Sequence, residues 1–152
     1  MKNSYKKLSS GTTMVELLIY MALLVIFLTV LMDVFVTTLN FKLQSESTSA
    51  LNQDTRFILE KISYDLYNAD NFTVPSPTQV SFTFAGTNNS YTISGGDLLR
   101  NSVKLNGTDT NVQSLTFTQI DNTLKVSFTL ESQINLPGGP RTQSVVTTVA
   151  PR

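Results

Sequence analysis

One carboxylate stands at the start of a long uncharged run in this chain. Glu16 is followed by sixteen uncharged residues before the next acid, Asp33. Seventeen helical steps of about 1.5 Å span about 26 Å, close to the ~30 Å hydrocarbon core of a bilayer. Because a charge in hydrocarbon costs a few kcal/mol, we expect the Glu16 carboxylate to have a positive partner.

Cleavage of the chain after Gly11 would create such a partner, the new α-amine of Thr12. Glycine has no Cβ and therefore lets the backbone extend into a peptidase site. If the amine of a neighbouring subunit lies beside Glu16, two charges that are each costly in lipid neutralise each other, and a subunit out of register leaves both unpaired. Alternatively, Glu16 meets the amine of its own chain, because Thr12 and Glu16 are one helical turn apart. We favour the contact between subunits.

The residues before Gly11 have the composition of an export leader. They are short and polar and include Lys2, Lys6 and Lys7, which the positive-inside rule keeps on the cytoplasmic side. The small-x-small sequence Thr48-Ser49-Ala50 lies too far beyond the apolar run for an ordinary signal-peptide cut. The sequence therefore predicts a single-pass membrane anchor with the rest of the chain outside the cytoplasm.

The stretch from Gly11 through Thr-Thr-Met-Val-Glu to Leu-Leu-Ile-Tyr resembles the prepilin-type signal of type IV pilins and pseudopilins. The resemblance implies that a prepilin peptidase cuts after Gly11, that the new amine of Thr12 is methylated, and that Glu16 is the fifth residue of the mature chain. Where the family usually has phenylalanine after the cut, this chain has Thr12. Segments 94–100 and 112–117 resemble J-type minor pseudopilins.

The remaining sequence predicts an α+β fold. Neither proline nor glycine occurs from Thr12 to Val74, which predicts one helix from near Thr12 to about Asn68. In its second half the apolar residues follow one helical face, while acids lie on more polar sides. The face comprises Leu51, Ile58, Ile62 and Leu66, and the acids are Glu46, Asp54, Glu60 and Asp65.

After Pro75 and Pro77 the apolar residues alternate with period two, which predicts an antiparallel sheet laid over the outer half of the helix. The expected strands lie near residues 80–85, 91–93, 115–118, 126–130 and 145–149, and the expected turns are 86–89, 95–96, 106–107 and 121–122. The predicted organisation is a leader (1–11), a membrane or filament-core helix (12–36), an amphipathic half (37–70) and a sheet head (71–152).

The composition argues against several classes of function. The chain has no cysteine and no histidine, so it lacks a thiol nucleophile, the commonest general base and the commonest metal ligand, and we expect no catalysis, no cofactor and no metal site. The oxygen-rich segment Asn106 to Asn111 lacks the acids of a calcium loop and is interpreted as a polar hairpin loop. The basic residues are scattered, so no direct nucleic-acid binding is expected.

The leading hypothesis is a minor pilin or pseudopilin subunit. The resemblance implies other pilin or pseudopilin subunits as partners, the bacterial inner membrane before assembly, and a filament used in protein secretion, DNA uptake, motility or adhesion. Asp33 is interpreted as an interfacial charge, with a contact to Lys42 of another copy as an alternative. The alternative function is a membrane-anchored extracytoplasmic binding module that never polymerises.

Overall fold

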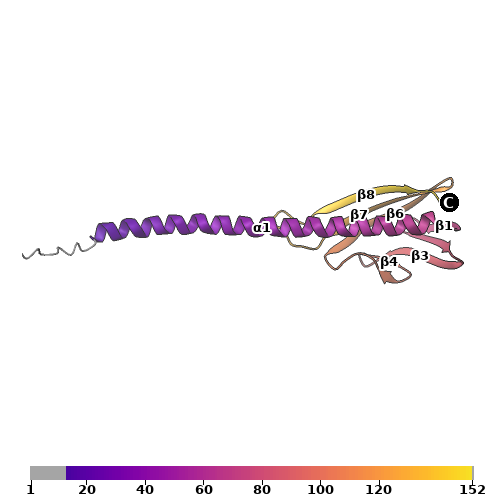
Figure 1. Ribbon diagram of the computed structural model, residues 1–152, viewed down its shortest axis with the longest axis horizontal. Helices are drawn as coiled ribbons and strands as arrows, with labels where there is room; N and C mark the ends of the chain where they lie inside the picture. The colour runs from indigo at the N-terminus through magenta and orange to yellow at the C-terminus, as the bar shows by residue number, and fades with distance from the viewer. Residues whose placement is uncertain (1–12, 152) are drawn as a thin grey trace, which may run out of the picture. The chain divides into compact units, whose positions relative to one another are not determined.

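The computed structural model describes residues 13–151 of the chain. It contains one helix followed by eight strands (Figure 1). The elements are α1 (Met14–Tyr67), β1 (Asn71–Ser76), β2 (Gln79–Phe84), β3 (Thr87–Ser94), β4 (Asp97–Arg100), β5 (Val103–Lys104), β6 (Thr110–Ile120), β7 (Thr123–Ser132) and β8 (Thr142–Val149). The predicted α+β class is confirmed, and α1 ends one residue before the predicted boundary.

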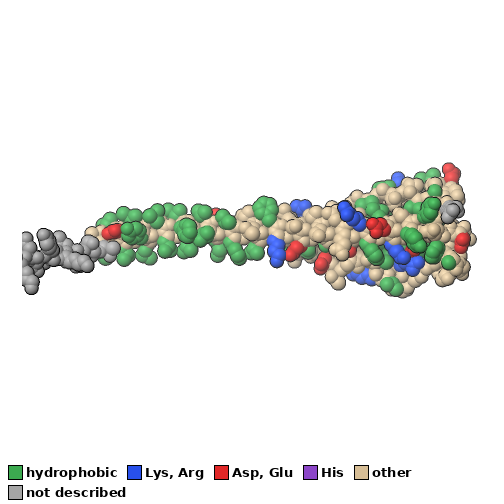
Figure 2. Space-filling model, viewed as in Figure 1, with side chains coloured by type: hydrophobic (Ala, Val, Ile, Leu, Met, Phe, Trp, Pro, Cys, Tyr) green, Lys and Arg blue, Asp and Glu red, His purple; other side chains and the backbone are tan. Residues whose placement is uncertain are grey.

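The chain divides into two compact units that meet between Leu39 and Asn40. The N-terminal unit contains the first part of α1 and no strand among its described residues. Apolar side chains cover this part of the helix on the face shown in Figure 2. The second unit contains the rest of α1 and all eight strands, and we refer to it as the head.

The strands of the head form two antiparallel sheets rather than the single sheet that the sequence predicted. Sheet A has the order β1-β2-β3-β4-β5, and sheet B has the order β6-β7-β8. Within each sheet, every strand pairs with the one that follows it in the sequence. The chain passes from sheet A to sheet B after β5, which has only two residues.

One apolar core joins the helix to both sheets. The predicted helix face is confirmed, because its four apolar residues, Leu51, Ile58, Ile62 and Leu66, are at most 3 % exposed. They belong to one cluster with inward-facing residues of both sheets, such as Phe82 of β2 and Phe128 of β7. Burying one side chain of this size contributes about 1.5–3 kcal/mol, so the face accounts for much of the attachment of the helix.

Two details of the strands differ from the sequence prediction. The turn expected at 86–89 is Ala85-Gly86, with φ of 50° and 73°, and Thr87 already pairs with Phe84. Two positive φ values suit the right-handed twist of a two-residue hairpin. Strand β1, which was not predicted, contains Pro75 and lies at an edge of sheet A, where a missing N–H group breaks no ladder.

Candidate functional site

The candidate assembly residues lie at the N-terminal end of α1. Gly11 and Thr12, the predicted cleavage and methylation residues, fall outside the described residues. Glu16 lies in the first turn of α1, where a negative charge is favourable to the helix dipole. Its backbone N–H donates to Oγ1 of Thr13 at 3.3 Å, so Thr13 caps the helix.

The side chain of Glu16 also has a partner one helical turn away. The hydroxyl of Tyr20 donates a hydrogen bond to Oε1 of Glu16 at 3.1 Å. Sequence reasoning missed Tyr20, although its i,i+4 spacing from Glu16 was a visible signal. No residue from 13 to 151 donates a hydrogen bond to Oε2, so within this part of the chain the oxygen is open to a further donor such as an amine.

The apolar run presents its side chains outward all around the helix. Each large apolar residue from Met14 to Leu39 is between 45 % and 82 % exposed within the chain. By length and composition, α1 can cross a membrane. The hydroxyls of Thr29 and Thr38 donate to backbone carbonyls four residues earlier, at 2.6 and 2.8 Å, so these two polar groups are satisfied inside the apolar run.

The charges near the end of the apolar run pair only in part. The Lys42 ammonium lies 3.6 Å from Glu46 of the same chain, and both side chains are exposed. Asp33 has no ion pair among the described residues. A contact between Asp33 and Lys42 of another copy stays a prediction.

A buried carboxylate links α1 to sheet A. Asp65 is 1 % exposed, and its Oδ2 accepts hydrogen bonds from the Tyr91 hydroxyl at 2.5 Å and from Nε of Arg100 at 2.6 Å. The Lys61 ammonium lies 3.5 Å from Oδ1, which accepts no hydrogen bond. The prediction that Asp65 lies on a polar side of the helix was wrong. Asp65 follows Ile58 by seven residues and Ile62 by three, and this is the spacing of the buried face.

The neighbours of Asp65 have altered proton affinities. Desolvation by burial, followed by the hydrogen bond to Asp65, raises the pKa of Tyr91 well above its usual value, so its hydroxyl stays protonated. Burial alone lowers the pKa of Arg100, but the hydrogen bond and charge of Asp65 outweigh it and the net change is upward. Tyr91 therefore remains a donor and Arg100 a cation, which suits a fixed structural contact rather than proton transfer.

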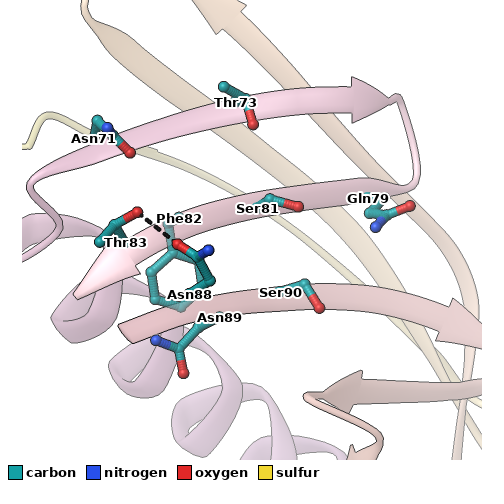
Figure 3. Close-up of a pocket in the computed structure, with 9 residues that line it drawn as sticks. All are labelled: Asn71, Thr73, Gln79, Ser81, Phe82, Thr83, Asn88, Asn89 and Ser90. Atoms are coloured by element: carbon teal, nitrogen blue, oxygen red, sulfur yellow. Dashed lines mark hydrogen bonds between the residues drawn. The ribbon is translucent and has the colours of Figure 1, made fainter. Parts of the chain in front are cut away.

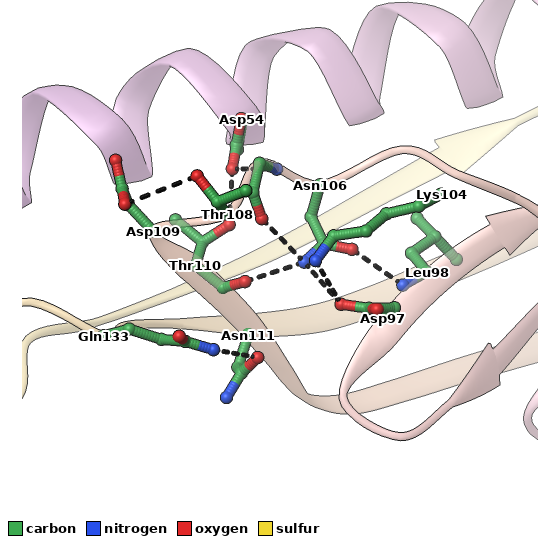
Figure 4. Close-up of polar contacts among 11 residues, drawn as sticks. Asp54, Asp97, Leu98, Lys104, Asn106, Thr108, Asp109, Thr110, Asn111 and Gln133 are labelled. Atoms are coloured by element: carbon green, nitrogen blue, oxygen red, sulfur yellow. Dashed lines mark hydrogen bonds and ion pairs between the residues drawn. The ribbon is translucent and has the colours of Figure 1, made fainter.

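A second polar cluster joins α1 to the connection between the sheets (Figure 4). Oδ2 of Asp54 accepts hydrogen bonds from the Gly107 N–H, at 2.7 Å, and from the Thr110 hydroxyl. Asn106 is 4 % exposed; its Oδ1 accepts from the Leu98 N–H at 2.9 Å, and its Nδ2 donates to the Thr110 carbonyl at 2.7 Å. The polar hairpin loop interpretation was therefore wrong, because this segment connects sheet A to sheet B through buried polar contacts.

The outer face of sheet A carries a shallow depression of about 420 Å³ (Figure 3). Its polar lining residues are Asn71, Thr73, Gln79, Ser81, Thr83, Asn88, Asn89 and Ser90. All are uncharged amides and hydroxyls, which can form hydrogen bonds but offer no group that titrates near neutral pH. Over residues 13–151, no three acidic, cysteine or histidine side chains gather in a way that could hold a metal ion.

Comparisons with known proteins do not assign this chain to a family. No family model, no curated protein and no solved structure matches the chain. The fold and the residues described above define the class of protein: an α+β head that follows a helix apolar enough to cross a membrane.

Proposed function

We propose that this protein is a pilin-like or pseudopilin-like subunit that assembles into a filament through its N-terminal helix. In this mechanism the chain is first anchored in the inner membrane, a prepilin peptidase cuts after Gly11, and the new amine of Thr12 is methylated. The amine then pairs with Glu16 of a neighbouring subunit. The apolar segments of the subunits exchange lipid contacts for contacts with one another.

The observation that carries the proposal is the first part of α1, which the other residues of 13–151 leave uncovered and which has one carboxylate in its first turn. Large apolar side chains that are at least 45 % exposed over the run from Met14 to Leu39 require either lipid or other helices around them. Lipid is as apolar as the helices, so burial alone adds little to their association. A charge pair at Glu16 would therefore contribute disproportionately to assembly and would set the stagger of the subunits.

The geometry of Glu16 is compatible with this role. Tyr20 donates to Oε1, while no residue from 13 to 151 donates to Oε2, which can therefore accept from a second donor. Thr13 caps the helix and so places Glu16 at the third helical position. The competing arrangement is an intrachain pair, in which Glu16 contacts the amine of its own chain.

The test compares insertion with assembly. Glu16→Ala should insert into the membrane normally but enter filaments at least about tenfold less than the parent, because one buried charge is left unpaired. Glu60→Ala, which removes an exposed acid from the second half of α1, is the control and should assemble like the parent. Equal incorporation of Glu16→Ala and the parent would refute the mechanism.

The membrane-anchored binding module is the second candidate, and the polar depression of sheet A is the observation that favours it. The N-terminus of the mature protein separates the two functions. An intact mass equal to that of a chain beginning at Thr12, with or without one methyl group, supports the filament subunit. Retention of residues 1–11 supports the static anchor.

A further inference from the structure

The sequence contains one Asn-Gly pair, Asn106-Gly107, and it lies in the connection between the two sheets. An asparagine followed by glycine can cyclise: the backbone nitrogen of Gly107 attacks Cγ of Asn106, a C–N bond forms, and ammonia leaves. Water then opens the ring and yields aspartate or isoaspartate. Glycine favours this reaction because no Cβ hinders the approach of its nitrogen.

The folded head engages both reacting groups. Three contacts to β4 and β6 hold the Asn106 side-chain amide: its Oδ1 accepts from the Leu98 N–H at 2.9 Å, and its Nδ2 donates to the Thr110 carbonyl at 2.7 Å and to Oδ1 of Asp97 at 3.2 Å. A longer contact of 3.5 Å runs from Nδ2 to the Gly107 carbonyl. The N–H of Gly107, which is the nucleophile, donates to Oδ2 of Asp54 at 2.7 Å. Cyclisation requires the amide to rotate and the Gly107 N–H to leave its acceptor, so these bonds must break first.

We propose that Asn106-Gly107 is a latent modification site that the fold keeps unreactive. Its cyclisation occurs only when the connection between sheets A and B opens, and the modified connection does not return to its original structure. Figure 4 shows how the site is assembled: Asp54 comes from α1, Asp97 and Leu98 from β4, and Thr110 from β6. Reaction therefore depends on separating these elements locally.

The product cannot restore the contacts of Asn106. A carboxylate has no proton to donate, so the Thr110 carbonyl would lose its donor and two negative groups would face each other at Asp97. Leaving buried polar groups unpaired costs more than the hydrogen bonds contributed. An isoaspartate would also lengthen the backbone by one atom beside Gly107. Once modified, the connection would therefore not close again as before.

The experiment follows deamidation of the full-length protein in detergent micelles at mildly alkaline pH. Mass spectrometry of the peptide that contains Asn106 is compared between native buffer and urea. We expect the reaction in native buffer to be at least about tenfold slower, because it proceeds only from a locally open state. Equal rates in the two conditions would overturn the proposal.

Two variants sharpen the test. Pro137→Asn places an asparagine before the exposed Gly138 in the loop between β7 and β8, and this control site should react at similar rates with and without urea. Protection of this control site equal to that of Asn106 would show that the head gives no specific protection. Asn106→Asp mimics the product and should unfold at a lower urea concentration than the parent; an unchanged midpoint contradicts the proposed irreversibility.

Discussion

The hydroxyl of Tyr20 donates a hydrogen bond to Oε1 of Glu16 at 3.1 Å, one helical turn along α1. In an aqueous surface helix such a contact contributes little, because water competes for both groups. At the end of a membrane-length apolar run fewer water molecules compete, so the same hydrogen bond is stronger. Tyr20 thus gives Glu16 a partner within its own chain, and none of residues 13–151 takes the second carboxylate oxygen, Oε2.

If the protein assembles as proposed, Tyr20→Phe should lower filament incorporation by about two- to tenfold, which corresponds to the loss of one hydrogen bond. Membrane insertion should not change, because phenylalanine is at least as apolar. Incorporation is measured as the ratio of filament to membrane-bound protein. Tyr67→Phe, a change at an exposed tyrosine of the head, is the control. If both variants assemble alike, Tyr20 does not support Glu16.

Removal of the buried carboxylate of Asp65 should strongly destabilise the head. Asp65→Ala leaves Tyr91 and Arg100 without their acceptor, so we expect a loss of about 3–5 kcal/mol in the free energy of unfolding. Urea unfolding of the protein in micelles measures it. Asp121→Asn, at an exposed turn, is the control and should change stability by less than about 0.5 kcal/mol.

Tyr91→Phe tests the same contact from sheet A. It removes one hydrogen bond to Asp65 but keeps the ring, which stacks on Phe82 with a centroid separation of 5.4 Å. We expect a smaller loss, about 1–3 kcal/mol, and the double variant with Asp65→Ala should be less destabilised than the sum of the two. Strict additivity would mean that the two side chains act independently.

Acid should weaken the contact between Asp97 of β4 and Lys104 of β5. The Lys104 ammonium lies 2.7 Å from Oδ1 of Asp97, and this hydrogen bond lowers the pKa of Asp97 below its ordinary value of 3.8. A carboxylate with a lowered folded-state pKa stabilises the fold above its unfolded pKa and loses that contribution as the pH falls through the folded value. The difference in urea midpoint between the parent and Asp97→Asn should therefore shrink below pH 3.8. A difference independent of pH would contradict this.

Gly96→Ala should destabilise the head by about 1–2 kcal/mol because alanine is strained in the left-handed region. Gly96 has φ +85°, and a Cβ there would lie 3.3 Å from Oδ1 of Asn111. Gly138→Ala is the matched control, since a Cβ at that glycine meets no atom within 4 Å. Thermal unfolding of the two variants should differ, and similar midpoints would show that the turn tolerates alanine.

The sequence by itself determined the helix and its apolar face. The absence of proline and glycine from Thr12 to Val74 allows one long helix, and the spacing of Leu51, Ile58, Ile62 and Leu66 identifies the side that the sheets cover. Period-two alternation located the longer strands, because each has one buried face. Helical spacing and period-two alternation both follow from the backbone geometry of neighbouring residues, so the sequence alone reveals them.

Only the tertiary structure decided which polar groups meet. Tyr91 and Arg100 reach Asp65 across 26 and 35 residues of sequence, and Gly107 reaches Asp54 across 53. Such contacts depend on the register of the strands and on how each sheet lies against the helix. A buried carboxylate or amide survives only where its partners are present, so its burial follows from the whole fold and not from the residues beside it.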